Sequence, residues 1–327
     1  MPAEICRQTA KAIICPLQKI KDDMEEKIMS KMKKIAAMTA ALLISASTMG
    51  YLPQDSLKIS NTTANAAEEE ITSVEINETN FPDAIFREYV KSSFDTDGDG
   101  VLSAEEIAAV TTIDVYSMGI SDLTGIEYFT SLENLWCYAN KLTAIDVSNN
   151  TALTGLFCDF NQLTSIDVSK NTKLFSFTCE GNQLTSLDLS NNPTLRSLYC
   201  LKNPLTSLDL SNNTNLGYLH CAENQLTSLD LSNNTALKEL YCSKNQLTSL
   251  DLSNNPKLTK LYCYKNQLTS LDLSNNTALE ILKADDNKFE IALTDNTFDL
   301  STLPTGFDVS KASEWTNGTV KGNILTV

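Results

Sequence analysis

The chain of 327 residues contains a single histidine, His220, and only two tryptophans. One histidine without a neighbouring nucleophile and orienting acid provides no arrangement for acyl transfer, and its surroundings suggest a surface ring. The sequence also lacks a phosphate-binding loop, a zinc-ligand spacing and a dinucleotide-binding fingerprint. Pairs of carboxylates can hydrolyse glycosides, but identical aspartates repeated on a flat face have no environment that separates their pKa values. The sequence therefore predicts a protein that is not an enzyme.

Basic residues are scarce. Lysine and arginine number 25 against 41 aspartates and glutamates, which gives a net charge of −16. Without residues 1–66 the balance becomes 16 against 35, or −19. Such a surface repels nucleic acid and anionic lipid, so we expect neither as a partner.

Long apolar runs are also rare. One such run, over residues 35–49, follows three lysines and resembles the core of a secretory signal peptide, with an Ala-Asn-Ala cleavage pattern at 64–66. We expect residues 1–66 to be an upstream extension plus this signal peptide, with translation starting at Met29 or Met32. No second hydrophobic span, wall-sorting motif or prenylation box follows. The mature chain is therefore predicted to be secreted or at the cell surface, without membrane insertion.

What the sequence does have is a repeat. Seven cysteines recur every 21 residues, and an asparagine follows each by three positions. Eight units align without a gap on the pattern L-x-x-L-x-C-x-x-N-x-L-T-x-L-D-L-S-x-N-x-x, starting at Leu132, Leu153, Leu174, Leu195, Leu216, Leu237, Leu258 and Leu279. The last unit lacks the cysteine and loses the second half of the pattern. An uninterrupted period of this length is typical of a solenoid, in which successive coils stack and like residues form columns.

The L-x-x-L-x-L-x-x-N frame of each unit resembles that of the leucine-rich repeat. An atypical unit precedes the regular ones, and its segment from Ile120 to Ile126 resembles the repeats of bacterial internalins. The leucine-rich-repeat resemblance covers about Val110 to Ala292, and the internalin-like architecture extends it to a cap that begins near Ile71. The resemblance implies a secreted or cell-surface binding protein whose sheet face engages a host or neighbouring-cell partner.

The composition of the repeat predicts its secondary structure. Units this short and this rich in Ser, Thr, Asn and Asp leave no room for an α-helix on the return side. We expect a mainly β fold, a leucine-rich-repeat solenoid of 21-residue coils with two short strands per coil and two facing parallel β-sheets. The asparagines three positions after the cysteines are expected to form a ladder that satisfies turn backbone groups: Asn140, Asn161, Asn182, Asn203, Asn224, Asn245, Asn266 and Asn287.

Four regions are predicted along the chain. Residues 1–66 precede a small α-helical, EF-hand-like N-terminal cap at 67–109, whose apolar residues recur at helical spacing. The solenoid follows at 110–292. Residues 293–327 depart from the repeat and are interpreted as a C-terminal β-type cap or as the start of a truncated domain.

The repeated cysteines occupy one inward position of every coil: Cys137, Cys158, Cys179, Cys200, Cys221, Cys242 and Cys263. Their number is odd, and neighbouring coils about 4.8 Å apart hold side chains too far apart for the Cβ separation of about 3.8 Å that a disulfide needs. We expect free thiols that pack as small apolar groups; bridging between coils and metal capture are the alternatives.

Residues 95–106 satisfy every position of the twelve-residue EF-hand calcium loop, with Gly100 at the sharp turn. The predicted ligands are oxygen atoms of Asp95, Asp97, Asp99, Val101 (its carbonyl), Ser103 and Glu106. The alternative is an acidic turn that caps a helix, but four carboxylates this close repel one another without a cation. We expect one structural Ca²⁺ that fixes the cap onto the first coil.

The second half of each unit barely changes, whereas outward positions of the first half vary freely. Aromatic rings accumulate there and are the predicted partner-binding residues: Trp136, Tyr138, Phe157, Tyr199, Tyr218, His220, Tyr241, Tyr262 and Tyr264. This aromatic stripe spans about 30 Å, enough for a protein face or a glycan chain. Mutual stacking of the rings is the alternative explanation, although the interruptions at Thr178 and His220 favour binding.

The constant half carries its own column of outward carboxylates: Asp146, Asp167, Asp188, Asp209, Asp230, Asp251 and Asp272. Their mutual repulsion in water is under about 1 kcal/mol per pair. We interpret the column as a solvated face that opposes sheet aggregation, with a weak divalent-cation strip as the alternative.

These features together predict a secreted or cell-surface binding or adhesion protein that recognises an extracellular protein or glycan through the aromatic stripe. The alternative is a carbohydrate-recognition or spacer module of a larger secreted enzyme, whose catalytic part would follow Val327.

Overall fold

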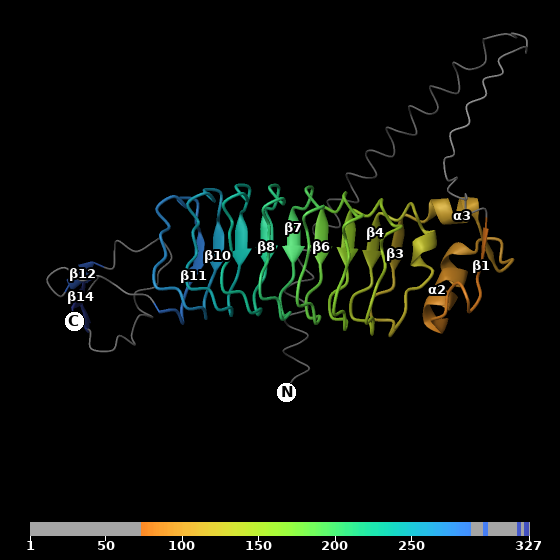
Figure 1. Cartoon of the computed structure of the whole chain (residues 1–327), viewed down its shortest axis with the longest axis horizontal. Helices are drawn as coiled ribbons and strands as arrows, with labels where there is room; N and C mark the ends of the chain where they lie inside the picture. The colour runs from red at the N-terminus through yellow and green to blue at the C-terminus, as the bar shows by residue number, and fades with distance from the viewer. Residues whose placement is uncertain (1–72, 289–296, 300–318, 322–323, 327) are drawn as a thin grey trace, which may run out of the picture. The chain divides into compact units, whose positions relative to one another are not determined.

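A computed structural model describes residues 73–288 and three short strands at 297–299, 319–321 and 324–326 (Figure 1). The predicted extension and signal peptide lie outside the described residues, as do the end of the predicted solenoid at 289–292 and most of 293–327.

The solenoid is built on one parallel sheet of nine three-residue strands, which lie side by side in chain order (Figure 1). The central residue of each strand points inward and lies opposite the equivalent residue of the next coil. Leu135 thus pairs with Leu156, and Leu156 pairs with Phe177. Register is therefore set by the repeat itself. The strands are β3 (Thr112–Asp114), β4 (Asn134–Trp136), β5 (Gly155–Phe157), β6 (Ser176–Thr178), β7 (Ser197–Tyr199), β8 (Tyr218–His220), β9 (Glu239–Tyr241), β10 (Lys260–Tyr262) and β11 (Ile281–Lys283).

The prediction of a second sheet on the return side is wrong, because each described coil contains one strand. On the return side, several backbone N–H groups are satisfied within the coil. Asp188 Oδ1 accepts from Ser190 N at 2.9 Å, and Asn192 N donates to Leu189 O at 3.0 Å. These local turns use the donors that a second ladder would need.

The interior is a continuous stack of leucines and cysteines. All seven repeat thiols are fully buried and free, which confirms the predicted apolar role. Burial in this medium raises the pKa of every one of them, as for Cys158 and Cys200. The thiolate, the reactive form, is therefore suppressed in the folded protein.

The predicted asparagine ladder is confirmed. Asn161 donates from Nδ2 to Cys137 O and Cys158 O at 3.0 and 3.1 Å, and Leu142 N donates to its Oδ1 at 3.0 Å. Each such side chain links carbonyls of two coils. The structure adds a second, almost fully buried column that was not predicted to bridge coils: Asn150, Asn171, Asn192, Asn213, Asn234, Asn255 and Asn276.

The N-terminal end of the sheet is covered by a small cap. Helices α2 (Ala84–Phe94) and α3 (Ala104–Ala109) are joined by a loop whose last residues form β2 (Val101–Ser103), and β2 pairs antiparallel with β1 (Ser73–Glu75). The short 3₁₀ helix η1 (Ile126–Tyr128) lies on the return side of the first unit. Within the described residues, no helix has the length and hydrophobicity to cross a membrane.

Three strands lie in the predicted closing segment. They are β12 (Thr297–Asp299), β13 (Thr319–Lys321) and β14 (Ile324–Thr326). The pairs β12–β14 and β13–β14 are antiparallel, in contrast to the parallel pairing of the solenoid.

Candidate functional site

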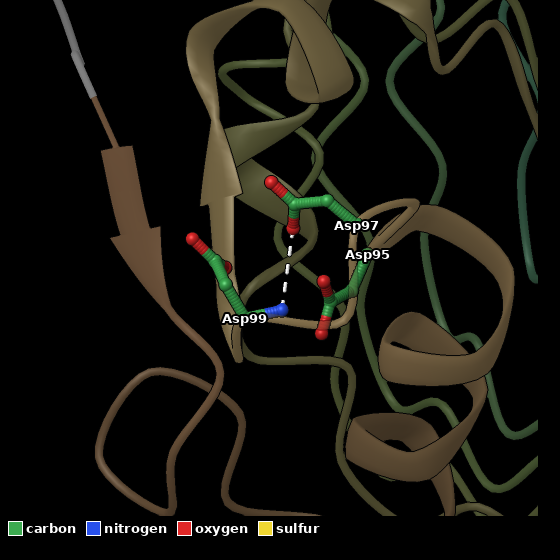
Figure 2. A group of neighbouring side chains, drawn as sticks. All are labelled: Asp95, Asp97 and Asp99. Carbon is green, nitrogen blue, oxygen red and sulfur yellow. Dashed lines mark hydrogen bonds between the residues drawn. The ribbon is translucent and has the colours of Figure 1, made fainter.

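The loop between α2 and α3 gathers three carboxylates. Oxygen atoms of Asp95, Asp97 and Asp99 all lie within 4.8 Å of one another, on a turn that starts directly after α2 (Figure 2). Gly98 and Gly100 have φ angles of 76° and 85°, in the left-handed region that favours glycine. These glycines let the chain turn tightly enough to bring alternate aspartates together.

Backbone donors inside the loop hold these carboxylates in place. Asp95 accepts from Gly98 N at 2.8 Å and from Gly100 N at 3.1 Å. Asp97 accepts from Asp99 N at 3.2 Å, the bond drawn in Figure 2. The loop is therefore folded by the same side chains that would bind a cation.

The remaining predicted ligands have different positions. Val101 begins β2, and its backbone pairs with Glu75. Ser103 caps α3 through its hydroxyl, which accepts from Glu106 N at 3.2 Å. The Glu106 carboxylate accepts from the Thr96 hydroxyl and amide, both at 2.6 Å, and from Ser103 N at 2.9 Å. These bonds, the Thr96 hydroxyl first, lower the pKa of Glu106 to about 2.

The structure thus brings Asp95, Asp97 and Asp99 together, and the group does not include Glu106. Instead, Glu106 ties the start of the loop at Thr96 to its end at Ser103, as a capping box does at the start of a helix. Glu106 is the twelfth residue of the loop, and these hydrogen bonds hold its carboxylate beside the loop.

The cap is joined to the first coil by polar and apolar contacts. Asp83 caps α2 through one carboxylate oxygen and accepts with the other from Ser121 N at 2.8 Å. The Phe81 ring is fully buried, and a Cβ added at Gly125 would lie 2.2 Å from it. Gly125 itself has φ 103°. This close approach explains the glycine in the first unit.

The aromatic stripe lies on the outward face of the sheet. The residues before and after each buried strand centre point to solvent, which places most predicted partner-binding rings on β4 to β10. Tyr138 and Tyr264 follow two residues after β4 and β10 and are half-buried. Tyr199 and Tyr218 are the most exposed of the predicted set, at 37% and 38%.

Neighbouring rings do contact one another, in tilted, edge-on and stacked arrangements, which agrees with the alternative explanation. Trp136 and Phe157 have centroids 5.9 Å apart. A second run joins Tyr199 to His220 at 5.8 Å, His220 to Tyr241 at 4.8 Å, and Tyr241 to Tyr262 at 4.6 Å. Thr178 separates the two runs. These contacts restrict the orientation of the rings, which remain half-buried or exposed.

His220 lies within the second run. Its burial between rings, aided by the charge of Lys202, lowers its pKa to about 4, so the imidazole is neutral at pH 7. The described structure therefore places His220 as a ring packed between Tyr199 and Tyr241.

Sequence reasoning missed three further exposed rings beside the stripe. Tyr116 stacks on Tyr138 with centroids 5.0 Å apart, and cations lie over the other two rings. Arg196 is 5.3 Å from the centroid of Phe175, and Lys202 is 5.7 Å from that of Phe160. The sequence did contain a signal for these three rings, because the positions that flank each strand also vary between units.

The aspartate column on the return face is exposed and makes local bonds. Asp209, for example, accepts from Ser211 N at 2.9 Å. Hydrogen bonds from the backbone and then the side chain of Ser211 lower the pKa of Asp209. The like charges of Asp188 and Asp230 act in the other direction, and the hydrogen bonds prevail. Each aspartate of the column thus begins a local turn by accepting from the amide two residues later. In the described part of the chain, the acidic group found close enough for a metal ion is the Asp95 cluster.

Repeat, parallel sheet and stacked interior define a leucine-rich-repeat solenoid. A family model described as "Leucine Rich repeats (2 copies)" matches residues 235–296. The chain is similar to internalin J of Listeria monocytogenes: the two are 38% identical over 71 residues, an alignment that covers 22% of this chain and 8% of that protein.

Two solved structures share the fold. The functional domain of InlJ from Listeria monocytogenes, described as including a cysteine ladder, is 36% identical with a TM-score of 0.57 over 67% of this chain and 54% of that chain. Internalin C2 of the same organism is 24% identical with a TM-score of 0.60, over 64% and 96%. The chain thus matches about half of the InlJ domain and a small fraction of whole internalin J.

Proposed function

We propose that this chain is a secreted or cell-surface binding protein that recognises an extracellular protein through the aromatic stripe. Its internalin-like character supports the role, and the net charge of −16 disfavours nucleic acid. Recognition is by a preformed surface and involves no chemical reaction.

One observation carries the proposal. Rings gather on the variable sheet face and are held by contacts with their neighbours, whereas the return face repeats the same short polar residues. Rigid aromatic side chains bury much area with little loss of conformational entropy, which is why they dominate interface energetics. A surface that served folding alone would need no variation from coil to coil.

The stripe is tested by the triple variant Tyr199→Ala/Tyr241→Ala/Tyr262→Ala. A pull-down with surface proteins of candidate host cells, run beside a glycan array, should show binding that the variant loses. Loss of at least about 2 kcal/mol is expected if these rings are interface hot spots. Binding confined to the array would make the partner a glycan.

The control is Thr206→Ala/Thr227→Ala/Thr248→Ala, three exposed return-face substitutions in successive coils. Circular dichroism establishes that both variants are folded. If the tyrosine variant binds as well as the threonine variant, the stripe is not the site.

We also propose that the Asp95 loop holds one structural Ca²⁺. The residues fit such an ion: three carboxylates converge, and two glycines adopt the required backbone. Asp95, Asp97 and Asp99 would bind directly, with the Val101 carbonyl, Ser103 and Glu106 as the remaining candidates. Calcium would neutralise the repulsion between the aspartates and keep the cap folded against the first coil.

Removing calcium should lower the melting temperature. For an ion at ten times its dissociation constant the expected loss is about 1.4 kcal/mol. Scanning calorimetry of the wild type with calcium and with chelator measures it. Asp95→Ala should melt early in both conditions and should not respond to chelator. A wild-type curve indifferent to chelator would reject the structural ion.

A further inference from the structure

The stripe is interrupted at its third regular coil by a polar gap, which we define as Asp159, Thr178 and Glu180. Thr178 occupies the position that carries a ring in most coils, and its hydroxyl donates to Asp159 Oδ2. Asp159 Oδ1 accepts from Glu180 N at 2.7 Å. The gap separates the Trp136–Phe157 pair from the run that starts at Tyr199.

Asp159 is half-buried at the edge of the gap, as is its equivalent in the next coil, Glu180. The equivalent residues of three later coils, Leu201, Ala222 and Ser243, are only 7%, 4% and 4% exposed. Burial raises the pKa of Asp159 to about 6, although its two hydrogen bonds act in the opposite direction. The charged form of Asp159 is therefore disfavoured in the folded protein at neutral pH, and an uncharged residue at this position would stabilise the fold.

The chain does not supply Asp159 with a cation. The nearby Lys202 donates to Glu180 Oε1 at 3.0 Å. The ion pairs found in the described part of the chain do not include Asp159. A half-buried carboxylate without an ion-pair partner, within the proposed recognition face, is what stability alone would remove and what binding would keep.

We propose that the polar gap receives one lysine or arginine side chain of the protein partner, with Asp159 as its counter-ion. The inference rests on the proposed function of the stripe. Phe157 and Tyr199 flank the gap, so a cation that enters it meets ring surface on both sides as well as the carboxylate. The acidity of the whole chain favours the approach of a cationic group.

The probe is a library of random linear peptides displayed on phage and selected against the full chain. Binders are synthesised, and each lysine or arginine is replaced by norleucine or citrulline. We expect one cation per binder whose replacement weakens binding about tenfold, and the same loss from Asp159→Asn, with no further loss when the two changes are combined. Asp209→Asn, an equal charge change on the return face, should leave affinity unchanged.

The outcomes separate the two proposals. Binders that depend on Tyr199, Tyr241 and Tyr262 but ignore Asp159→Asn would overturn the polar gap and leave the stripe standing. Binders that ignore the tyrosines, or a library without binders, would count against both. A binder that needs Asp159 without any cation would also overturn the inference.

A stability measurement tests the premise without a ligand. Because the folded-state pKa of Asp159 is about 6, above its ordinary 3.8, its charge destabilises the fold above pH 6. That penalty disappears as the pH falls below 4, where both states are protonated. Asp159→Asn should therefore raise the melting temperature at pH 7.5 and leave it unchanged near pH 3.5. If the variant is no more stable than the wild type at pH 7.5, the charge of Asp159 does not destabilise the fold.

Discussion

Gly125→Ala is expected to destabilise the cap and first coil by about 4 kcal/mol, from combined overpacking and backbone strain. The new Cβ would lie 2.2 Å from Phe81 Cδ1 and 2.6 Å from the Asn80 carbonyl oxygen, at a φ of 103°. The Phe81 ring cannot move aside easily, because it is fully buried between Phe86 and Tyr128 at centroid distances of 6.0 and 5.8 Å. Urea denaturation followed by circular dichroism measures the loss.

Gly119→Ala separates the two contributions. Gly119 also has a positive φ, 81°, but a Cβ there would meet only Lys141 Nζ, at 3.9 Å. This control should therefore lose about 1 kcal/mol, the backbone term alone. Equal losses in the two variants would show that the contact with Phe81 does not hold the cap.

Asn192→Ala is expected to cost about 3 kcal/mol, because it removes one of the two donors from each of two buried carbonyls and opens a cavity. Asn192 Nδ2 donates to Val168 O at 3.1 Å and to Asn171 O at 2.9 Å, and so joins consecutive coils. In a solenoid each coil contacts only its neighbours, so the loss at this interface weakens the array there.

The neighbouring Asn191 is exposed and provides the control. Asn191→Ala should change the free energy of unfolding by less than about 0.5 kcal/mol. Both variants are compared by urea denaturation with a common slope. If they are equally stable, the second asparagine column does not hold the coils together.

The repeat interval was enough to predict the architecture around the sheet. A leucine, cysteine and asparagine returning every 21 residues must form columns, and the buried thiols and the Asn140 to Asn287 ladder follow from that. The Asn150 column recurs at the same interval, so its signal was present as well. What the spacing did not reveal was that its side chains point inward, because exposed and buried asparagines adjoin in the S-N-N sequence.

The candidate sites were predictable to different degrees. The calcium loop is a local pattern, so its aspartates converge through turns that its own glycines permit. The aromatic stripe required only alternation along a strand. The environment of Asp159 could not be predicted, because its hydrogen-bond donors are Thr178 and Glu180 of the next coil.

By itself, the order of residues determined the coil length, the inward columns, the outward rings and the ligand spacing of the loop, because each is a periodic or local pattern. Only the tertiary structure decided that the return side forms turns without a second sheet and that the Phe81 ring packs directly against Gly125. It also decided that the Asp159 carboxylate is half-buried at the gap between the two runs of rings. The physical reason is that burial, contact and competition for hydrogen bonds are properties of neighbouring coils, and each coil acquires them only when the next one packs against it.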